Sequence, residues 1–238
     1  MKNLKQYITE KLKITKDNIF IFEYHPKNFD ELNTIVKERI TEAKKRGDEI
    51  IDLTNIDTSK IQTMQNLFRQ AEVEKIDVSG WDTSNVKNMI EMFRESSIKD
   101  IIGISNWDVS KVLNMEGMFQ FCRNLNKDLD LSNWDVSNVI SMKKMFLDSS
   151  FNSNISDWDV SNVENMREMF CGSTFNNDIS KWDVSNVENM YQMFADSLFD
   201  QDISNWTLHK DCCTKYTYLF ENSPIELHQE KWPKNYEK

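Results

Sequence analysis

Aspartate recurs at intervals of 24–27 residues, directly after a tryptophan or, in the first copy, after an isoleucine. Carboxylates repeated in this way could form a ladder that binds metal cations. Alternatively, each aspartate accepts N–H bonds from its own turn while the next serine caps a helix. Stacked carboxylates repel one another unless local donors stabilise them, so we favour the turn. The positions are Asp57, Asp82, Asp108, Asp135, Asp159 and Asp183.

One local cluster of residues in the sequence could be catalytic, namely His209 with Cys212 and Cys213. A thiolate near a histidine could act as a nucleophile or bind a metal. Two adjacent cysteines point in different directions on most backbones, so we expect packing in the C-terminal region instead. The sequence has no HExxH zinc pattern, no glycine-rich phosphate loop and no GxSxG motif. We therefore expect no enzyme, no cofactor and no metal site.

The charge balance restricts the class of partner. The chain has 39 acidic and 29 basic residues and a net charge of −10. Such a surface repels phosphate backbones and anionic lipid, so direct nucleic-acid or membrane-surface binding is disfavoured, whereas a basic partner is attracted. No apolar run reaches the length of a membrane span, and the first 17 residues are too charged for a secretory signal. We expect a cytoplasmic protein with reduced cysteines, unless an export segment lies outside this sequence.

A repeat organises most of the chain. Tryptophans mark it at intervals of 26, 27, 24, 24 and 24 residues, and Ile56 holds the same place one interval upstream. Fixed apolar positions at such a period are typical of a solenoid, in which each unit buries its apolar side against its neighbours. The tryptophans are Trp81, Trp107, Trp134, Trp158, Trp182 and Trp206.

Within one unit the apolar spacing changes. In residues 178–180 a single aliphatic side chain is flanked by polar ones, as in a short strand with one inward residue. After the tryptophan, Val187, Met190, Met193 and Phe194 fall at i, i+3, i+6 and i+7, which is one side of a helix. The Ser-Asn-Val-Glu phrase that opens this segment matches a helix capping box. We expect a short strand, a turn and a short helix in each unit, with the methionines and aromatics in the core.

The sequence thus predicts an α/β solenoid, a right-handed, leucine-rich-repeat-like coil of about seven units over residues 51–203. Residues 1–50 are expected to form an N-terminal cap of helix, strand and helix, with the strand at Asn18 to Tyr24. The second helix is expected in KNFDELNTIVKERITEAKKRG, where Phe29, Leu32, Val36, Ile40 and Ala43 form one apolar stripe and Gly47 is the C-cap. Residues 204–238 are expected to form a degenerate last repeat and an irregular C-terminal cap.

Polar rows flank the inward aliphatic of each predicted strand, and alternation directs them outward. The row before the aliphatic is Asp52, Asp77, Gly103, Asp130, Asn154, Asp178 and Asp202. A polar, acidic strip of this kind suits recognition of a basic protein, and equally a solvated surface kept polar for solubility. The candidate partner-binding residues are Asp52, Thr54, Asp77, Ser79, Ser105, Asp130, Ser132, Asn154, Ser156, Asp157, Asp178, Ser180, Lys181, Asp202 and Ser204.

The phrases WDVSNVENMREMF, WDTSNVKNMIEMF and WDVSNVISMKKMF resemble the bacterial BspA-like repeats, also described as a mycoplasma lipoprotein-associated repeat region of unknown function. The resemblance covers about residues 52–203 and extends to EYHPKNFDELNTIVKERI upstream. It implies a repeat scaffold, in some members on the bacterial surface, with adhesion or protein binding suggested. It implies no catalytic residues.

Three functions from different classes follow as expectations. The first is a non-enzymatic scaffold that binds an unknown protein through the acidic strand face, and the net charge favours a basic partner. The second is an acidic mimic of nucleic acid that inhibits a DNA- or RNA-binding enzyme, and its charge is diluted by serine, asparagine and lysine. The third is an enzyme with its chemistry in a cap where the repeat breaks down, at Cys212 and His209, and we expect no such activity. A surface adhesin is a further alternative, if an export signal lies outside this chain.

Overall fold

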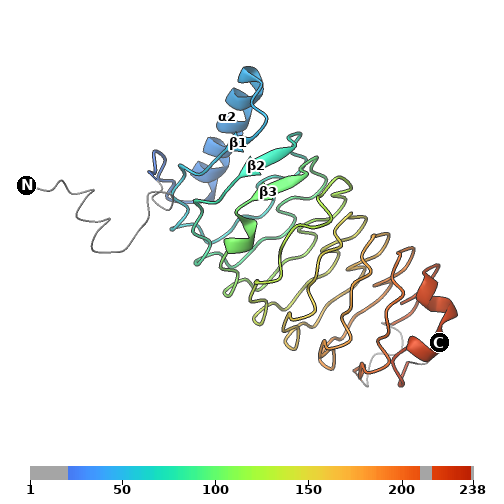
Figure 1. The fold of residues 1–238 in the computed structure, drawn as a ribbon. Coiled ribbons are helices and arrows are strands. Elements are labelled where there is room, and N and C mark those ends of the chain that lie inside the picture. The colour runs from blue at the N-terminus through green and yellow to red at the C-terminus, as the bar shows by residue number, and fades with distance from the viewer. Residues whose placement is uncertain (1–20, 210–215, 237–238) are drawn as a thin grey trace, which may run out of the picture.

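The computed structural model describes residues 21–209 and 216–236, in which one helix is followed by a stack of coils (Figure 1). The elements are α2 (Phe29–Arg46), β1 (Ile51–Asp52), β2 (Lys75–Asp77), β3 (Asp100–Ile102) and the short 3₁₀ helices η2 (Ile104–Asn106), η3 (Pro224–Leu227) and η4 (Gln229–Lys231). Each repeat contributes one coil, and successive coils lie side by side. No helix of the described residues is long and apolar enough to cross a membrane.

Helix α2 begins and ends at the residues that its sequence specifies. The Asn28 side chain accepts the backbone N–H of Glu31, and Gly47 ends the helix in the left-handed conformation with a φ of 75°. Leu32 and Val36 are fully buried against the start of the coil stack. The predicted first helix of this cap, and the start of the predicted strand, lie outside the described residues. In the remainder of that strand, Tyr24 forms one parallel bridge with Ile56.

The strands form a parallel sheet in the order β1-β2-β3. Ile51 pairs with Ile76 and Ile76 with Ile101, a shift of one repeat at each step. A strand in all seven units was expected, and this was wrong: within the described residues the strands stop at β3. In a parallel sheet each N–H bonds a backbone carbonyl of a neighbouring strand. In later coils an asparagine side chain accepts the N–H instead; for example, the Asn176 N–H bonds the Asn152 Oδ1 at 2.8 Å.

Gly103 is an extra residue rather than a member of the outward aspartate row. Asp77 pairs with Ile102, so Ile102 holds the place predicted for Gly103. Gly103 has a φ of 90°, and a Cβ there would lie 2.3 Å from the Cα of Ser79. Only glycine accommodates both this conformation and this close approach. The single insertion therefore shifts the register by one position and leads directly into η2.

The helix predicted after each tryptophan is absent from the described residues. Met89 and Glu91 donate their N–H groups to the next coil, to the carbonyls of Asn114 and Glu116, while the Met92 N–H bonds the Met89 carbonyl three residues back. This alternation continues along each segment. A helix needs every N–H for its own chain, but here the neighbouring coil supplies half of the acceptors, so the backbone takes a different path.

That path places every fourth residue in the left-handed region. The φ angles at these positions lie between 51° and 64°. With this backbone path, the valine, methionine and phenylalanine side chains of each segment point inward and are buried. The left-handed positions in this part of the coils are Asn66, Gln70, Glu91, Glu95, Gly117, Phe121, Lys144, Asp148, Glu168, Gly172, Gln192, Asp196, Tyr218 and Asn222.

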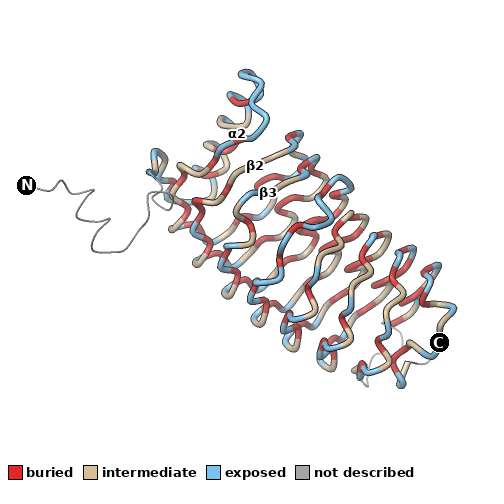
Figure 2. The backbone as a smooth tube through the Cα atoms, viewed as in Figure 1, coloured by how far each residue is buried: buried red, intermediate tan, exposed pale blue. Residues whose placement is uncertain are grey.

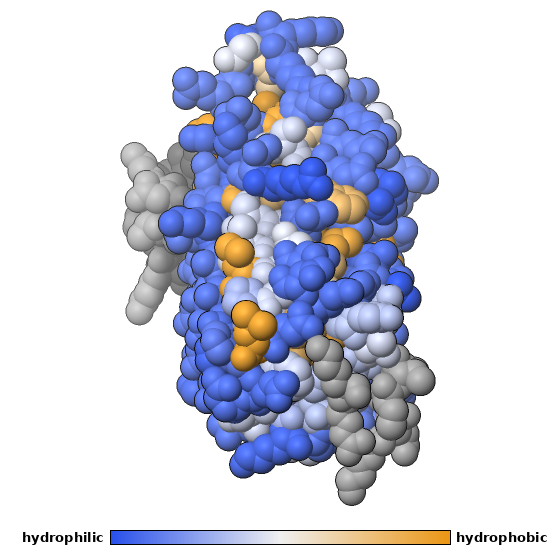
Figure 3. Space-filling view, turned by 90° about the vertical axis from the view of Figure 1, so that its right-hand side faces the viewer, coloured by the Kyte–Doolittle hydropathy of each residue, from blue (hydrophilic) through white to orange (hydrophobic). Residues whose placement is uncertain are grey.

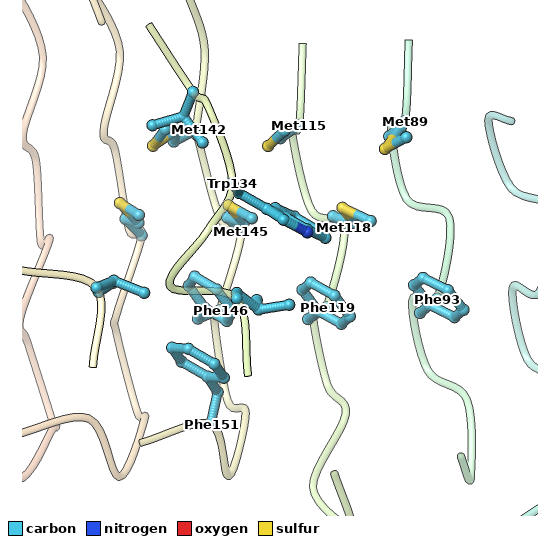
Figure 4. Packing of buried hydrophobic residues seen from close by; sticks show 14 of the residues in the cluster. Met89, Phe93, Met115, Met118, Phe119, Trp134, Met142, Met145, Phe146 and Phe151 are labelled. Carbon is cyan, nitrogen blue, oxygen red and sulfur yellow. The ribbon is translucent and has the colours of Figure 1, made fainter. Parts of the chain in front are cut away.

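Stacked rings and methionines fill the core, as the apolar spacing predicts (Figures 2 and 4). Phe93 and Phe119 stack with their ring centroids 5.3 Å apart, and Phe119 and Phe146 lie 5.6 Å apart. A parallel column of tryptophans is spaced at 6.1–6.5 Å. Burial of each such side chain stabilises the fold by roughly 1.5–3 kcal/mol. Because each coil contributes similar side chains, this stabilisation is spread over the whole stack.

The phenylalanine column continues into the C-terminal region. Trp232 stacks on Phe220 at 5.3 Å, and Tyr236 meets Phe220 edge-on. The Ile203 N–H bonds the Lys231 carbonyl at 3.0 Å. Residues 231–236 therefore lie against the last coils and cover the end of their aromatic core.

Candidate functional site

The strand face is defined here as the outward rows of the segments that contain β1–β3 and of their counterparts in later coils. Five aspartates of the strand face, all candidate partner-binding residues, and Asn154 each hold a tight turn. In each, the side-chain Oδ1 accepts the backbone N–H two residues later, at 2.8–3.0 Å. The pairs are Asp52 with Thr54, Asp77 with Ser79, Asp130 with Ser132, Asn154 with Ser156, Asp178 with Ser180, and Asp202 with Ser204.

These bonds favour the ionised form of three of the carboxylates, those of Asp130, Asp178 and Asp202. The Ser132 hydroxyl and N–H lower the pKa of Asp130, and the Ser180 N–H, with its hydroxyl, lowers the pKa of Asp178. The pKa of Asp202 is lowered in the same way by Ser204. The turn uses only Oδ1 of each carboxylate, so the second oxygen is not needed to hold it.

The aspartates that follow the tryptophans also hold turns, as predicted. The Ser161 N–H and hydroxyl both bond the Oδ1 of Asp159, at 3.1 and 2.6 Å. The same pair forms between Asp183 and Ser185. The predicted role of the serine was wrong: it does not cap a helix, but donates its hydroxyl to the preceding aspartate.

Ion pairs are distributed unequally between the two sides of the coils. On the methionine side, defined by the outward residues of 62–70, 87–95 and their counterparts, acids are paired across neighbouring coils. These pairs are Arg69–Glu91 at 2.8 Å, Lys143–Glu116 at 2.7 Å, Lys144–Glu168 at 3.3 Å and Arg123–Asp148 at 3.3 Å.

On the strand face, Asp130, Asp178 and Asp202 form no ion pair with any residue that the structure describes. Two ion pairs lie on this face, Lys181 with Asp157 at 3.6 Å and Lys75 with Asp100 at 3.7 Å. Exposed pairs of this kind contribute little. The charges of Lys181 and Lys231 also help to lower the pKa values of Asp178 and Asp202, without forming ion pairs with them. The strand face therefore keeps a net negative charge, whereas the methionine side neutralises much of its own.

One predicted residue departs from the pattern. Ser105 lies in η2, and since Ile102 replaces the aspartate of its row, it has no carboxylate partner for a turn.

The surface seen from the C-terminal coils is mainly hydrophilic, with small separated hydrophobic areas (Figure 3).

Two exposed isoleucines on this face, Ile50 and Ile102, were not predicted from the sequence. The side chains of Ile50 and Ile102 contribute to one shallow pocket beside β3. The signal was present in the repeat intervals: 26 and 27 residues separate the tryptophans around this site, against 24 later in the chain. Longer units break the regular row and leave room at the surface.

Of the three catalytic candidates, only His209 lies within the described residues. Within the described part of the chain no cluster of histidine, cysteine and carboxylate residues could hold a metal. Burial raises the pKa of the Cys122 thiol to about 12 and, with nearby carboxylates, that of Cys171 to about 11, so both thiols stay protonated. His209 is half-buried, and its carbonyl accepts the Tyr216 hydroxyl at 3.3 Å. Cys212 and Cys213 lie outside the described residues.

The chain belongs to a known repeat family. It matches the family described as "Mycoplasma protein of unknown function, DUF285" over residues 36–149 and again over 127–232. Comparison with curated proteins and with solved structures gives no match. The two matched stretches divide the coils between them and include the end of α2.

Proposed function

We propose that this protein is a non-enzymatic solenoid scaffold that binds another protein through its strand face. The observation that carries the proposal is the uneven distribution of ion pairs. Several carboxylates on the methionine side are paired across neighbouring coils, whereas Asp130, Asp178 and Asp202 form no ion pair with the described residues. A basic partner would supply the missing cations.

The turns support this assignment, because they hold the carboxylates in place before binding. Each Oδ1 is fixed by an N–H within 3.0 Å. A partner therefore loses less free energy in ordering these side chains than it would on a mobile surface. Rigid, repeated coils also present their outward rows over a long, continuous surface, as binding solenoids do.

Nucleic-acid mimicry needs an uninterrupted row of negative charge, and the strand face does not present one. B-DNA carries one charge per about 3.4 Å on each strand. The aspartate row is broken by Ile102 and Asn154, and Lys181 adds a cation beside it. Protein binding is therefore the better proposal.

The test compares two charge-matched variants as bait in affinity capture from the native cell, with quantitative mass spectrometry. The strand-face variant carries Asp130→Asn, Asp178→Asn and Asp202→Asn. Asparagine keeps the turn, because Asn154 already accepts the Ser156 N–H at 2.9 Å. The control removes the same charge from the methionine side, through Glu91→Gln, Glu116→Gln and Glu168→Gln.

We expect a partner that the wild-type chain and the control capture and the strand-face variant loses. Its retention should fall as salt rises, because exposed charges are screened. A partner that stays bound to the strand-face variant at wild-type level would contradict the proposal.

A further inference from the structure

The pocket beside β3 has apolar walls and lies on the strand face. It encloses about 290 Å³. Ile50 and Ile102 contribute to it with 42% and 40% of their surface exposed, and Ile104 and Leu129 are buried at its base. Ile50 immediately precedes β1 and Ile102 ends β3, so two exposed isoleucines from different coils meet at one pocket. Exposed apolar groups gathered in this way are unfavourable in water, unless a ligand covers them.

The pocket exists because the coils change length at this point. Gly103 adds one residue after β3, which puts Ile102 where the earlier strands have Asp52 and Asp77. In the next coil, the Asn126 N–H still reaches the Lys99 carbonyl at 2.8 Å. Beyond this bond, no backbone hydrogen bond joins β3 to residues 127–130 of the described chain. The surface is therefore hollowed between β3 and the following segment.

Carboxylates surround the apolar walls. Asp100, Asp128 and Asp130 line the pocket, with Lys75 as its one cation among the described residues. Lys75 is 3.7 Å from Asp100, while Asp128 and Asp130 have no ion pair within the described chain. The pocket thus combines an apolar interior with an unbalanced negative rim.

We infer that this pocket binds an extended segment of the partner protein that carries an aliphatic side chain with lysine or arginine two positions away. Side chains two residues apart in an extended segment lie on the same side, about 6.5–7 Å apart. The aliphatic group then enters between Ile102 and Leu129, and the cation meets Asp128 or Asp130. This assignment rests on the proposed function and specifies the chemistry of the partner.

A synthetic peptide provides the probe. Fluorescein-labelled Gly-Ser-Lys-Ser-Leu-Ser-Lys-Ser-Gly is titrated with the full chain and followed by fluorescence anisotropy. Matched peptides replace leucine with serine, or both lysines with glutamate. We expect the leucine peptide to bind about tenfold more tightly than the serine peptide, since burying an aliphatic side chain contributes about 1.5 kcal/mol. The glutamate peptide should not bind.

Variants of the protein separate anchoring from general charge attraction. Ile102→Asp restores the aspartate of the row and adds a negative charge. An apolar anchor predicts weaker binding of the leucine peptide, whereas charge attraction alone predicts tighter binding. Asp130→Asn should weaken binding several-fold, while Asp202→Asn, which removes the same charge outside the pocket, should not.

Equal binding of the leucine and serine peptides, or tighter binding by Ile102→Asp, would overturn the inference. Failure of this inference and failure of the proposed function give different experimental results. If the captured partner is lost from the strand-face variant but retained by Ile102→Asp, the scaffold proposal stands and the pocket is not its anchor. If the strand-face variant keeps the partner, the scaffold proposal itself fails.

Discussion

The indole N–H of Trp182 donates to the carbonyl oxygen of Ile155 in the preceding coil at 3.1 Å. The same bond joins Trp134 to Ile104 and Trp206 to Ile179. Trp107 is the exception, since its buried Nε1 has no hydrogen-bond partner. The extra residue Gly103 lies directly upstream of it, and the register of this coil differs from that of its neighbours. The tryptophans therefore act both as core residues and as links between coils.

Replacing Trp182 by phenylalanine should destabilise the protein more than the same change at Trp107. Both substitutions remove the same volume from a column of stacked rings, so they share the packing cost. Only Trp182→Phe also loses a hydrogen bond, which contributes about 1 kcal/mol. Urea unfolding followed by circular dichroism measures the difference. Equal loss of stability in the two variants would show that the indole bond does not contribute.

Much of the fold could be predicted from the sequence, because burial follows the repeat directly. Val187, Met190 and Phe194 are fully buried, as their spacing indicates. The predicted helix failed for a physical reason. A segment with left-handed residues at every fourth position brings the same side chains inward as a helix does, and the sequence pattern does not reveal that the next coil supplies the acceptors.

The strand face was predicted from alternation, but its chemistry was only partly foreseen. Turns were predicted for the aspartates that follow the tryptophans but not for those of the strand face, although the same Asp-x-Ser spacing occurs there. The pairing of acids on the methionine side depends on which coils are neighbours, as in Arg69 with Glu91, 22 residues apart. The pocket was missed because a single inserted glycine exchanges an aspartate for Ile102.

Gly103→Ala should cost much more stability than Gly47→Ala. Both glycines are left-handed, with φ of 90° and 75°, so alanine is strained at each by about 1 kcal/mol. At Gly47 a Cβ meets nothing within 4 Å, whereas at Gly103 it would lie 2.3 Å from the Cα of Ser79. The backbone must move there, so we expect a loss of more than 2 kcal/mol. Thermal unfolding compares the two, and similar melting temperatures would contradict the close approach.

Stability should decrease in acid as the turn aspartates become protonated. The Ser161 hydroxyl and N–H hold the pKa of Asp159 below its ordinary value of 3.8, and Ser110 does the same for Asp108. A carboxylate with a lowered folded-state pKa stabilises the fold above its ordinary pKa, and this contribution is lost as pH falls through the folded-state pKa.

Asp159→Asn tests the origin of this acid sensitivity, because asparagine keeps the acceptor and does not titrate in this range. The variant should lose less stability than the wild type between pH 5 and about 2. Urea unfolding over this range measures the slope for each protein. Parallel slopes would mean that the turn carboxylate does not contribute to the acid response.

Asp200 fastens the C-terminal segment to the coils. Its Oδ1 accepts the Lys231 ammonium at 2.8 Å and meets the His228 Nδ1 at 2.6 Å. Partial burial acts to raise the pKa of Asp200, but the bonds from Lys231 and His228 outweigh it and the pKa is lowered. Asp200→Ala removes both contacts, so residues 224–232 should open more often.

Hydrogen exchange measured by mass spectrometry follows this opening. Exchange of peptides from 224–232 should accelerate several-fold in Asp200→Ala, while peptides from the central coils around Phe119 should keep wild-type rates, because each coil contacts only its neighbours. Asp202→Asn is the control, since it removes a charge two residues away but keeps its turn with Ser204. Unchanged exchange in Asp200→Ala would show that the Asp200 carboxylate is not needed, and that the stacking of Trp232 on Phe220 and the backbone bonds of Ile203 and Ile225 hold the segment in place.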